Sequence, residues 1–152
     1  SGPTAAFATI VAGIVATLMV IFLAKDTKVF VNKLIPFKGY IAMAFFNMIF
    51  WREEYETYLI NEYHKSYVDK VVNHEGIHTC QMRDFCKWLP LGGIIFYIVY
   101  VLEWLLRLFI NGPKNAYSNI SFEREAKQNE RNMNYKNERV RFANFKNYLK
   151  KK

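Results

Sequence analysis

Apolar and charged residues are segregated along this chain rather than mixed. Residues 4–24 carry no charged side chain, whereas residues 123–152 are dense in Lys, Arg, Glu and Asn. The uncharged stretch has 21 residues, and a helix of that length can cross a hydrocarbon core of about 30 Å. The pattern therefore predicts an N-terminal transmembrane helix, within a first segment of residues 1–27.

Lysines follow the expected span at positions 25, 28, 33 and 38, and no cation precedes it. The positive-inside rule then places the chain after the span in the cytoplasm. Within the span, Ala8, Ala12 and Ala16 form a row of small residues at four-residue spacing. Such a row lets a second helix approach closely, so a helix-mediated oligomer is expected.

The stretch from Pro36 to Trp51 is apolar on both alternating faces, but its 16 residues are too few for a second span. Gly39, Asn47 and the aromatic content favour a buried strand or hairpin, whereas the alanines and methionines equally allow a helix. In either form, the stretch is expected to lie beside the helix that follows it.

Helical periodicity and helix breakers predict three further helices, over Ser66 to Trp88, Leu91 to Ile110 and Pro113 to about Arg131. Ser66 is the expected N-cap of the first helix. The second helix is apolar except for Glu103 and Arg107, which lie four residues apart and can pair on one face. Charges in an apolar helix need partners. If this helix simply crossed the membrane, Glu123 would lie on the opposite side from His74, so we expect the helix to be partly embedded in the membrane or re-entrant.

The basic end of the chain is expected to form a third segment, residues 136–152. Phe142, Phe145 and Leu149 recur there at helical spacing among cations. This pattern is typical of an amphipathic helix that lies in a membrane interface, and a partner-binding or merely solvated tail is the alternative.

Composition supports a membrane partner. The chain has 152 residues, is 52% hydrophobic and has a formal net charge of +8. No nucleic-acid motif accompanies this charge, so we expect contact with anionic membrane lipid and no nucleic-acid partner. The two cysteines, Cys80 and Cys86, imply no disulfide framework, in agreement with a reducing compartment.

The sequence His74-Glu75-Gly76-Ile77-His78 carries the candidate chemistry. On a helix the two histidines are one turn apart, so both imidazoles project from one face and can hold two corners of a tetrahedral Zn²⁺ site. Glu75 is then the general base that takes a proton from a metal-activated water. The alternative is a pair of ordinary surface or core histidines. His64 stands alone and is expected to be a surface residue.

A zinc site needs a third protein ligand. Asp84 lies six residues after His78, but on a continuous helix it would point about 240° away from that histidine. If the three expected helices pack up, down and up, Glu123 and Glu103 both reach the height of the histidines. Helix geometry alone therefore leaves both glutamates as candidates for the third ligand, and the pair Glu103 and Arg107 can also orient a ligand from behind. The alternative for Glu123 is an exposed carboxylate on a charged helix.

The pattern His74-Glu75-x-x-His78, followed by Ser121-Phe122-Glu123-Arg124-Glu125-Ala126, resembles the gluzincin metallopeptidases. Among these it is most similar to the membrane-associated CAAX prenyl proteases and heat-shock membrane proteases, in which such a glutamate is the third zinc ligand. Glu123 and Ala126 match that class, whereas Lys127 replaces its aspartate. The resemblance thus selects Glu123 as the third ligand, with Glu103 and Arg107 as a pair that orients it or a histidine. The chain is also similar to small bacterial membrane proteins of unassigned function.

The resemblance implies a mainly α fold. The fold expected for the whole chain combines a small zincin-like bundle within residues 28–135, with a short strand or hairpin, and the N-terminal transmembrane helix, which the apolar pattern predicts and the resemblance does not cover. The implied function is a membrane-bound zinc hydrolase, and the leading hypothesis is a metallopeptidase that acts on a peptide or protein substrate. The expected location is the bacterial inner membrane, with the metal domain on the cytoplasmic side. The alternatives are a zinc-stabilised, non-catalytic membrane scaffold and a hydrolase of esters or lipids.

Overall fold

The computed structural model describes residues 2–23, 27–86 and 91–150, and the side chains of 17–23 and 91 are not described. It is mainly helical, as the sequence predicts, and contains a small three-stranded sheet. The helices are α1 (Pro3–Leu23), α2 (Glu56–Ile60), α3 (Lys65–Phe85), α4 (Leu91–Asn111), α5 (Pro113–Ala116), α6 (Ser121–Asn129), α7 (Tyr135–Glu138) and α8 (Ala143–Asn147). The strands are β1 (Lys28–Asn32), β2 (Ala42–Phe45) and β3 (Met48–Arg52). Short 3₁₀ turns are η1 (Glu53–Tyr55), η2 (Glu62–His64) and η3 (Tyr117–Asn119).

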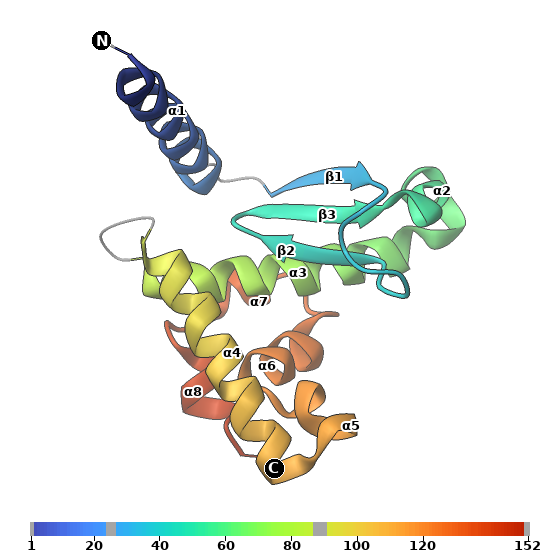
Figure 1. Cartoon of the computed structure of the whole chain (residues 1–152). Coiled ribbons are helices and arrows are strands. Elements are labelled where there is room, and N and C mark those ends of the chain that lie inside the picture. The colour runs from blue at the N-terminus through green and yellow to red at the C-terminus, as the bar shows by residue number, and fades with distance from the viewer. Residues whose placement is uncertain (1, 24–26, 87–90, 151–152) are drawn as a thin grey trace.

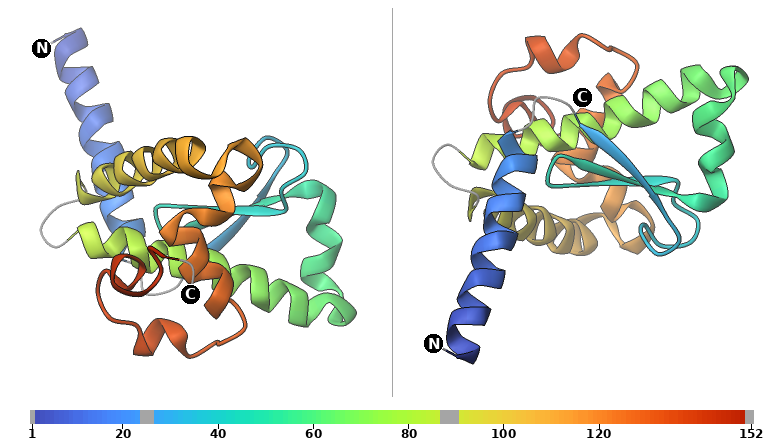
Figure 2. Two further views of the ribbon diagram at one scale, coloured as in Figure 1. Left: turned by 90° about the horizontal axis from the view of Figure 1, so that it is seen from below. Right: turned by 90° about the horizontal axis from the view of Figure 1, so that it is seen from above.

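Helix α3 lies at the centre, with the sheet on one side and α4, α6 and α8 on the other (Figure 1). Helix α1 leads away from these elements in all three ribbon views (Figures 1 and 2). Within the described residues, the helix long and apolar enough to cross a membrane is α4, over Gly92–Asn111. The apolar part of α1 described with its side chains, Pro3–Ala16, is shorter. The expected N-terminal span is thus helical but not confirmed as a crossing.

The sheet has the order β1-β3-β2, so β2 is an edge strand. Strands β2 and β3 form an antiparallel hairpin, and β1 pairs parallel to β3. Ile49 and Trp51 alternate on one face of β3 and are fully buried, which anchors the sheet to the body of the protein. The hairpin within residues 36–51 is thus confirmed, whereas β1 was not predicted.

A two-residue turn joins β2 to β3. Phe46 and Asn47 both adopt positive φ, of 47° and 59°, as the tight hairpin turns that match strand twist require. The Phe46 ring rests on Gly93 of α4, where an added Cβ would lie 2.7 Å from the ring. Glycine at position 93 therefore lets the hairpin dock closely onto α4.

Helix α3 differs from its prediction at its N-terminus. It begins at Lys65 with His64 at the cap position, so Ser66 lies inside the helix and is not the N-cap. The 3₁₀ turn η2 leads into the helix here, and Asn61 accepts the backbone N–H of Tyr63 in that turn. The helix ends at Phe85, and the predicted end at Trp88 lies outside the described residues.

The predicted helix from Pro113 to about Arg131 is wrong as one continuous element. It is divided into α5, η3 and α6, because Ile120 has extended backbone, with φ −62° and ψ 133°. The Glu103 carboxylate reaches across from α4 and accepts hydrogen bonds from the Ser121 N–H and Oγ, each at 2.7 Å. Glu103 thus caps α6 from another helix, and the buried Ile120 side chain stabilises the break.

The basic tail does not form one interfacial helix, which corrects that prediction. It contains the short helices α7 and α8, and Phe142 between them has a positive φ of 57°. The Arg139 guanidinium is buried and binds Asp84 and Glu125 at 2.9 and 2.8 Å. Because these ion pairs are inside the protein, the tail packs against α3 and α6 instead of lying free.

Candidate metal centre

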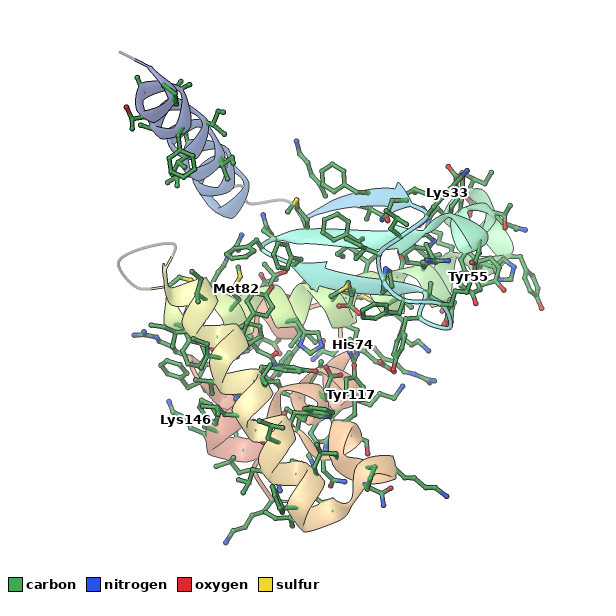
Figure 3. The ribbon with its side chains drawn as sticks, in the orientation of Figure 1. Lys33, Tyr55, His74, Met82, Tyr117 and Lys146 are labelled. Carbon is green, nitrogen blue, oxygen red and sulfur yellow. The ribbon has the colours of Figure 1, made fainter. Side chains whose placement is uncertain are left out.

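Three of the predicted site residues converge between α3 and α6. The Nε2 atoms of His74 and His78 lie 3.2 Å apart. They lie 3.4 and 3.2 Å from the two carboxylate oxygens of Glu123. One ligand atom from each of the three residues falls within 4.8 Å of the other two. Figure 3 shows His74 facing the space between α3 and the segment that carries Tyr117.

The other ring nitrogen of each histidine has a partner. His74 Nδ1 lies 3.0 Å from the Glu130 carboxylate, and His78 Nδ1 lies 2.7 Å from Oε1 of Gln81. The Gln81 amide is oriented by its own NH₂ group, which donates to the Phe122 carbonyl and to Glu125. Its oxygen therefore faces His78 and accepts a hydrogen bond from Nδ1–H. In the neutral ring, the lone pair is left on Nε2, the atom that faces Glu123.

The end of α6 is tied to α3 by Asn73, which precedes His74. Its buried amide donates to the carbonyls of residues 129, 130 and 132. These bonds hold the backbone of Glu130, whose side chain also pairs with Lys127 at 2.9 Å. The carboxylate behind His74 is therefore positioned by both helices.

The centre is electrostatically coupled. Burial alone would lower the pKa of His78, but the charge and hydrogen bond of Glu123 outweigh it and raise the pKa to about 9. Burial would raise the pKa of Glu123, yet the two histidines hold it far below its usual range. The pKa of Glu130 is also lowered, because hydrogen bonds from Lys127 and His74 outweigh its burial.

Two imidazoles and one carboxylate make a donor set that suits Zn²⁺. The Nδ1 partners leave both Nε2 atoms aimed at Glu123, as ligands of one ion require. These residues therefore fit a zinc ion held by His74, His78 and Glu123.

Glu75 lies beside this cluster and is almost fully buried. Its Oε2 accepts the N–H of Ala44, on the edge strand β2, at 2.8 Å. Burial raises the pKa of Glu75, and the charges of the two histidines oppose this rise. Glu75, His78 and Glu123 together line a pocket of about 250 Å³, whose other walls come from α4, β2 and the connection before β2.

Tyrosines surround the carboxylate of Glu123. Tyr100 donates a hydrogen bond of 2.6 Å to Glu123 Oε1. Tyr117 lines the same pocket, and burial together with the negative charge of Glu123 raises its pKa. Sequence reasoning did not select any of the ten tyrosines, because these two become neighbours of Glu123 only through the packing of α4 and η3.

The remaining candidates lie elsewhere. Glu103 pairs with Arg107 at 3.4 Å, as predicted, but its carboxylate binds Ser121, so it holds the start of α6 and does not contact a histidine. Asp84 binds Arg139. His64 stacks on Tyr58, with ring centroids 4.1 Å apart.

Glu130 and Gln81 were not predicted as partners of the histidines. Helical spacing carried a signal for both. Gln81 follows His78 by three residues, and Glu130 follows Glu123 by seven, which is two turns on the same face.

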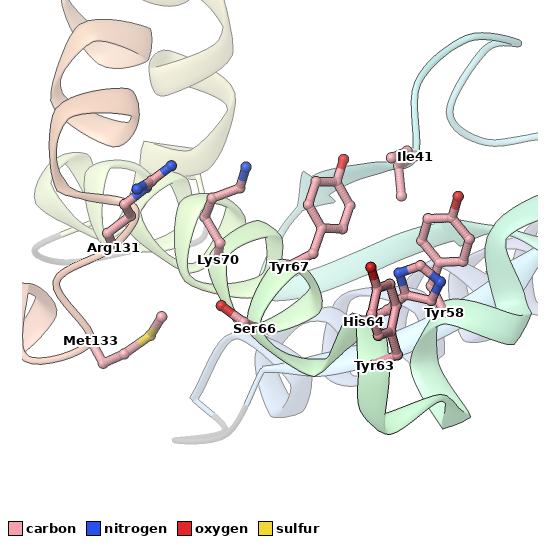
Figure 4. A pocket seen from close by; sticks show the side chains of 9 residues that line it. All are labelled: Ile41, Tyr58, Tyr63, His64, Ser66, Tyr67, Lys70, Arg131 and Met133. Atoms are coloured by element: carbon pink, nitrogen blue, oxygen red, sulfur yellow. The ribbon is translucent and has the colours of Figure 1, made fainter.

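A second, larger pocket of about 760 Å³ lies nearer the start of α3. Lys70, one turn before His74, lines it together with Arg131, which follows Glu130. Figure 4 shows Arg131, Lys70, Tyr67 and Ile41 in this order across the pocket, and the Lys70 ammonium lies 4.7 Å from the centre of the Tyr67 ring. Ile41, which also lines this pocket, immediately precedes β2, so the pocket adjoins the start of the edge strand.

Comparison with known proteins adds no relative to this picture. No family model matches the chain, and neither a curated protein nor a solved structure matches it at a significant level.

Proposed function

We propose that this protein is a membrane-bound zinc-dependent hydrolase, and specifically a metallopeptidase of the gluzincin type. The observation that carries the proposal is the convergence of His74, His78 and Glu123, with Glu75 buried beside them. A zinc ion bound there supplies a Lewis acid that acidifies water and polarises a carbonyl group.

Glu75 is suited to the role of general base. Its raised pKa makes it a better proton acceptor than an exposed carboxylate. Its position at the pocket wall also allows it to return the proton to a leaving amine. The hydrogen bond from Ala44 orients the side chain toward β2.

The edge strand β2 supports a peptide substrate. Ile41 accepts a hydrogen bond from Arg52, and in an antiparallel pair every second residue bonds to the partner strand. Ala42 and Ala44 therefore turn their backbone groups to the free edge, where Ala44 contacts Glu75. A peptide that adds to this edge as a further strand would pass directly over Glu75.

The membrane part of the proposal rests on α4. Its apolar span is only slightly buried within the protein, so its outer face is available to lipid. We propose that α4 is embedded, that α1 provides a further membrane anchor, and that the membrane is the bacterial inner membrane with the metal centre on its cytoplasmic side.

A non-catalytic zinc scaffold is the second candidate. It is favoured by the way the three ligands join α3 to α6, since a metal at such a junction stabilises the fold. In this case Glu75 would only hydrogen-bond to β2.

Glu75→Gln separates the two functions. For a peptidase, the variant should retain zinc and fold but cleave a library of fluorescence-quenched apolar peptides about 10²-fold or more slowly than the wild type. Glu62→Gln, an exposed acid outside the site, is the matched control and should keep full activity. A wild-type protein that holds zinc without cleaving any member of the library, and that unfolds when zinc is removed, would support the scaffold instead.

A further inference from the structure

The connection between β1 and β2 presents apolar side chains to the outside. Leu34 is 81% exposed and Phe37 is 82% exposed, and Ile35 between them is 43% exposed. Isolated apolar residues on a surface are ordinary, but a contiguous group of this size marks an interaction site.

Polar groups beneath the connection hold it in this form. Oδ1 of Asn32 accepts the N–H groups of Leu34 and Ile35, at 2.9 and 2.7 Å. The buried Arg52 guanidinium donates to the carbonyls of Lys33 and Pro36. These hydrogen bonds satisfy backbone groups of the connection within the protein, while its apolar side chains point outward. Such a segment can enter an apolar environment without leaving these backbone groups unpaired.

This apolar surface continues onto the sheet and α4. The outer face of the sheet carries Met43, Phe45 and Phe50, which form one hollow with residues 34–37. Phe45 also lines a second hollow, shared with Ile98 and Val101 on the exposed face of α4. The connection, the sheet face and the apolar helix therefore form one surface that meets at Phe45.

Cations flank the exposed connection. Lys33 and Lys38 bracket residues 34–37, and Lys28 begins β1; all three are exposed. The Lys33 ammonium lies 3.7 Å from Glu53, but an exposed pair of this kind is weak. An apolar patch bordered by lysines matches the boundary between acyl chains and anionic headgroups.

We propose that residues 33–38 and the outer face of the sheet form a lipid-docking surface that inserts into an anionic bilayer beside α4. The hollow behind residues 34–37 shares Pro36, Phe37 and Met43 with the pocket that contains Glu75. Docking would therefore open that pocket toward the acyl chains. This second consequence rests on the proposed function: the substrate would be an apolar segment that reaches Glu75 from the membrane.

Depth measurements test the docking surface without reference to catalysis. The two native cysteines of the full chain are first replaced, by Cys80→Ala and Cys86→Ala. A single cysteine is then introduced by Phe37→Cys or, as the matched control, by Ile60→Cys. Ile60 is 83% exposed on α2 and lines neither of the two hollows of the proposed surface. Each protein is labelled with a small fluorophore and reconstituted in vesicles of phosphatidylethanolamine and phosphatidylglycerol. Quenching by spin-labelled acyl chains and by aqueous iodide is then compared.

The label at position 37 should be quenched by the acyl-chain probe severalfold more than the label at position 60, with the reverse order for iodide. Replacing the anionic lipid by phosphatidylcholine should lower the docked fraction. The equilibrium constant for docking should fall by about fivefold for each lysine. Equal iodide quenching at both positions would overturn the proposal. Protection from both quenchers would overturn it too, since a second copy would then cover the surface.

The same measurement on His74→Ala/His78→Ala separates this inference from the proposed function. Docking needs no metal, so the label should remain at the same depth after zinc is lost. If the wild-type protein docks but is inactive, the lipid-docking surface is supported, and only the proposed entry of substrate from the membrane is wrong.

Discussion

At the residue scale, the centre depends on which ring nitrogen of each histidine carries a proton. Gln81 and Glu130 accept from Nδ1, so the Nε2 lone pairs of the neutral rings face Glu123. Without metal, the negative Glu123 instead favours a protonated His78, whose pKa is raised to about 9. A proton and a metal ion therefore compete for the same nitrogen.

Zinc binding to the metal-free protein at pH 7 should release about one proton from His78. The release should decline as the pH rises through about 9, and the apparent zinc affinity should increase up to that pH and then level off. Calorimetry in two buffers of different ionisation enthalpy counts the protons. His64→Ala, which removes the histidine outside the centre, is the control and should leave the count unchanged.

The same pair sets the stability of the metal-free protein. Since the pKa of His78 is raised from 6.5 to about 9, its contribution is complete below about pH 6.5 and is lost as the pH rises through about 9. The pKa of Glu123 is lowered from 4.5, so its contribution is complete above about pH 4.5 and is lost in acid. Thermal melts of the metal-free protein should therefore peak between these limits.

At the scale of elements, α6 is the helix that completes the centre, and its start is set by α4. Glu103 binds Ser121, two residues before Glu123. The Glu103 and Arg107 side chains are only 9% and 13% exposed, so removal of one leaves the other poorly compensated. Glu103 therefore supports the ligand through the backbone, without touching it.

Glu123→Ala and Glu103→Ala should fail in different ways. Glu123→Ala should weaken zinc affinity by more than the 10 to 100-fold typical of residues behind the ligands. Glu103→Ala should stay within that range but lower the free energy of unfolding by about 1–2 kcal/mol, the scale of a lost cap, or more because Arg107 is left behind. Chelator competition and chemical denaturation measure the two quantities. If Glu103→Ala strips the zinc while Glu123→Ala retains it, the assigned ligand set is wrong.

At the scale of the whole molecule, the two ends of the chain contribute unequally. Helix α1 projects from the other elements (Figure 1). The C-terminal segment is built into the interior, where Arg139 joins Asp84 of α3 to Glu125 of α6. Burial would lower the pKa of Arg139, but its hydrogen bonds with Glu125 and Asp84 outweigh burial and raise the pKa above its usual value. The guanidinium therefore stays charged and paired.

Deletion of residues 136–152 should abolish cooperative unfolding and zinc binding, because it leaves the buried Asp84 and Glu125 carboxylates without their cation. Deletion of residues 1–23 should leave zinc affinity in detergent unchanged. Thermal melts with zinc titration distinguish these outcomes. An equally stable, zinc-binding protein lacking residues 136–152 would show that the tail is dispensable.

Much of the centre was predictable because helical periodicity is local. Three residues of backbone between His74 and His78 suffice to put both rings on one face, whatever packs around them. The apolar α4 also follows from a pattern within a few residues, whereas the pattern before α3 favoured a strand or hairpin without excluding a helix. Glu123 does lie beside the two histidines, although the helix assumed in reaching it is interrupted at Ile120, and its role as a ligand stays a prediction.

The remaining features depend on pairs of residues that are distant in sequence. Glu103 pairs with Arg107 as predicted, but it also accepts hydrogen bonds from the N–H and Oγ of Ser121 on another helix, and no local pattern encodes such partners. Phe142, Phe145 and Leu149 have the spacing of one amphipathic helix, but the buried pairing of Arg139 with Asp84 and Glu125 draws the tail into the core. Periodicity determines which face of an element is apolar, whereas the choice of what covers that face is made by the packing of the whole chain.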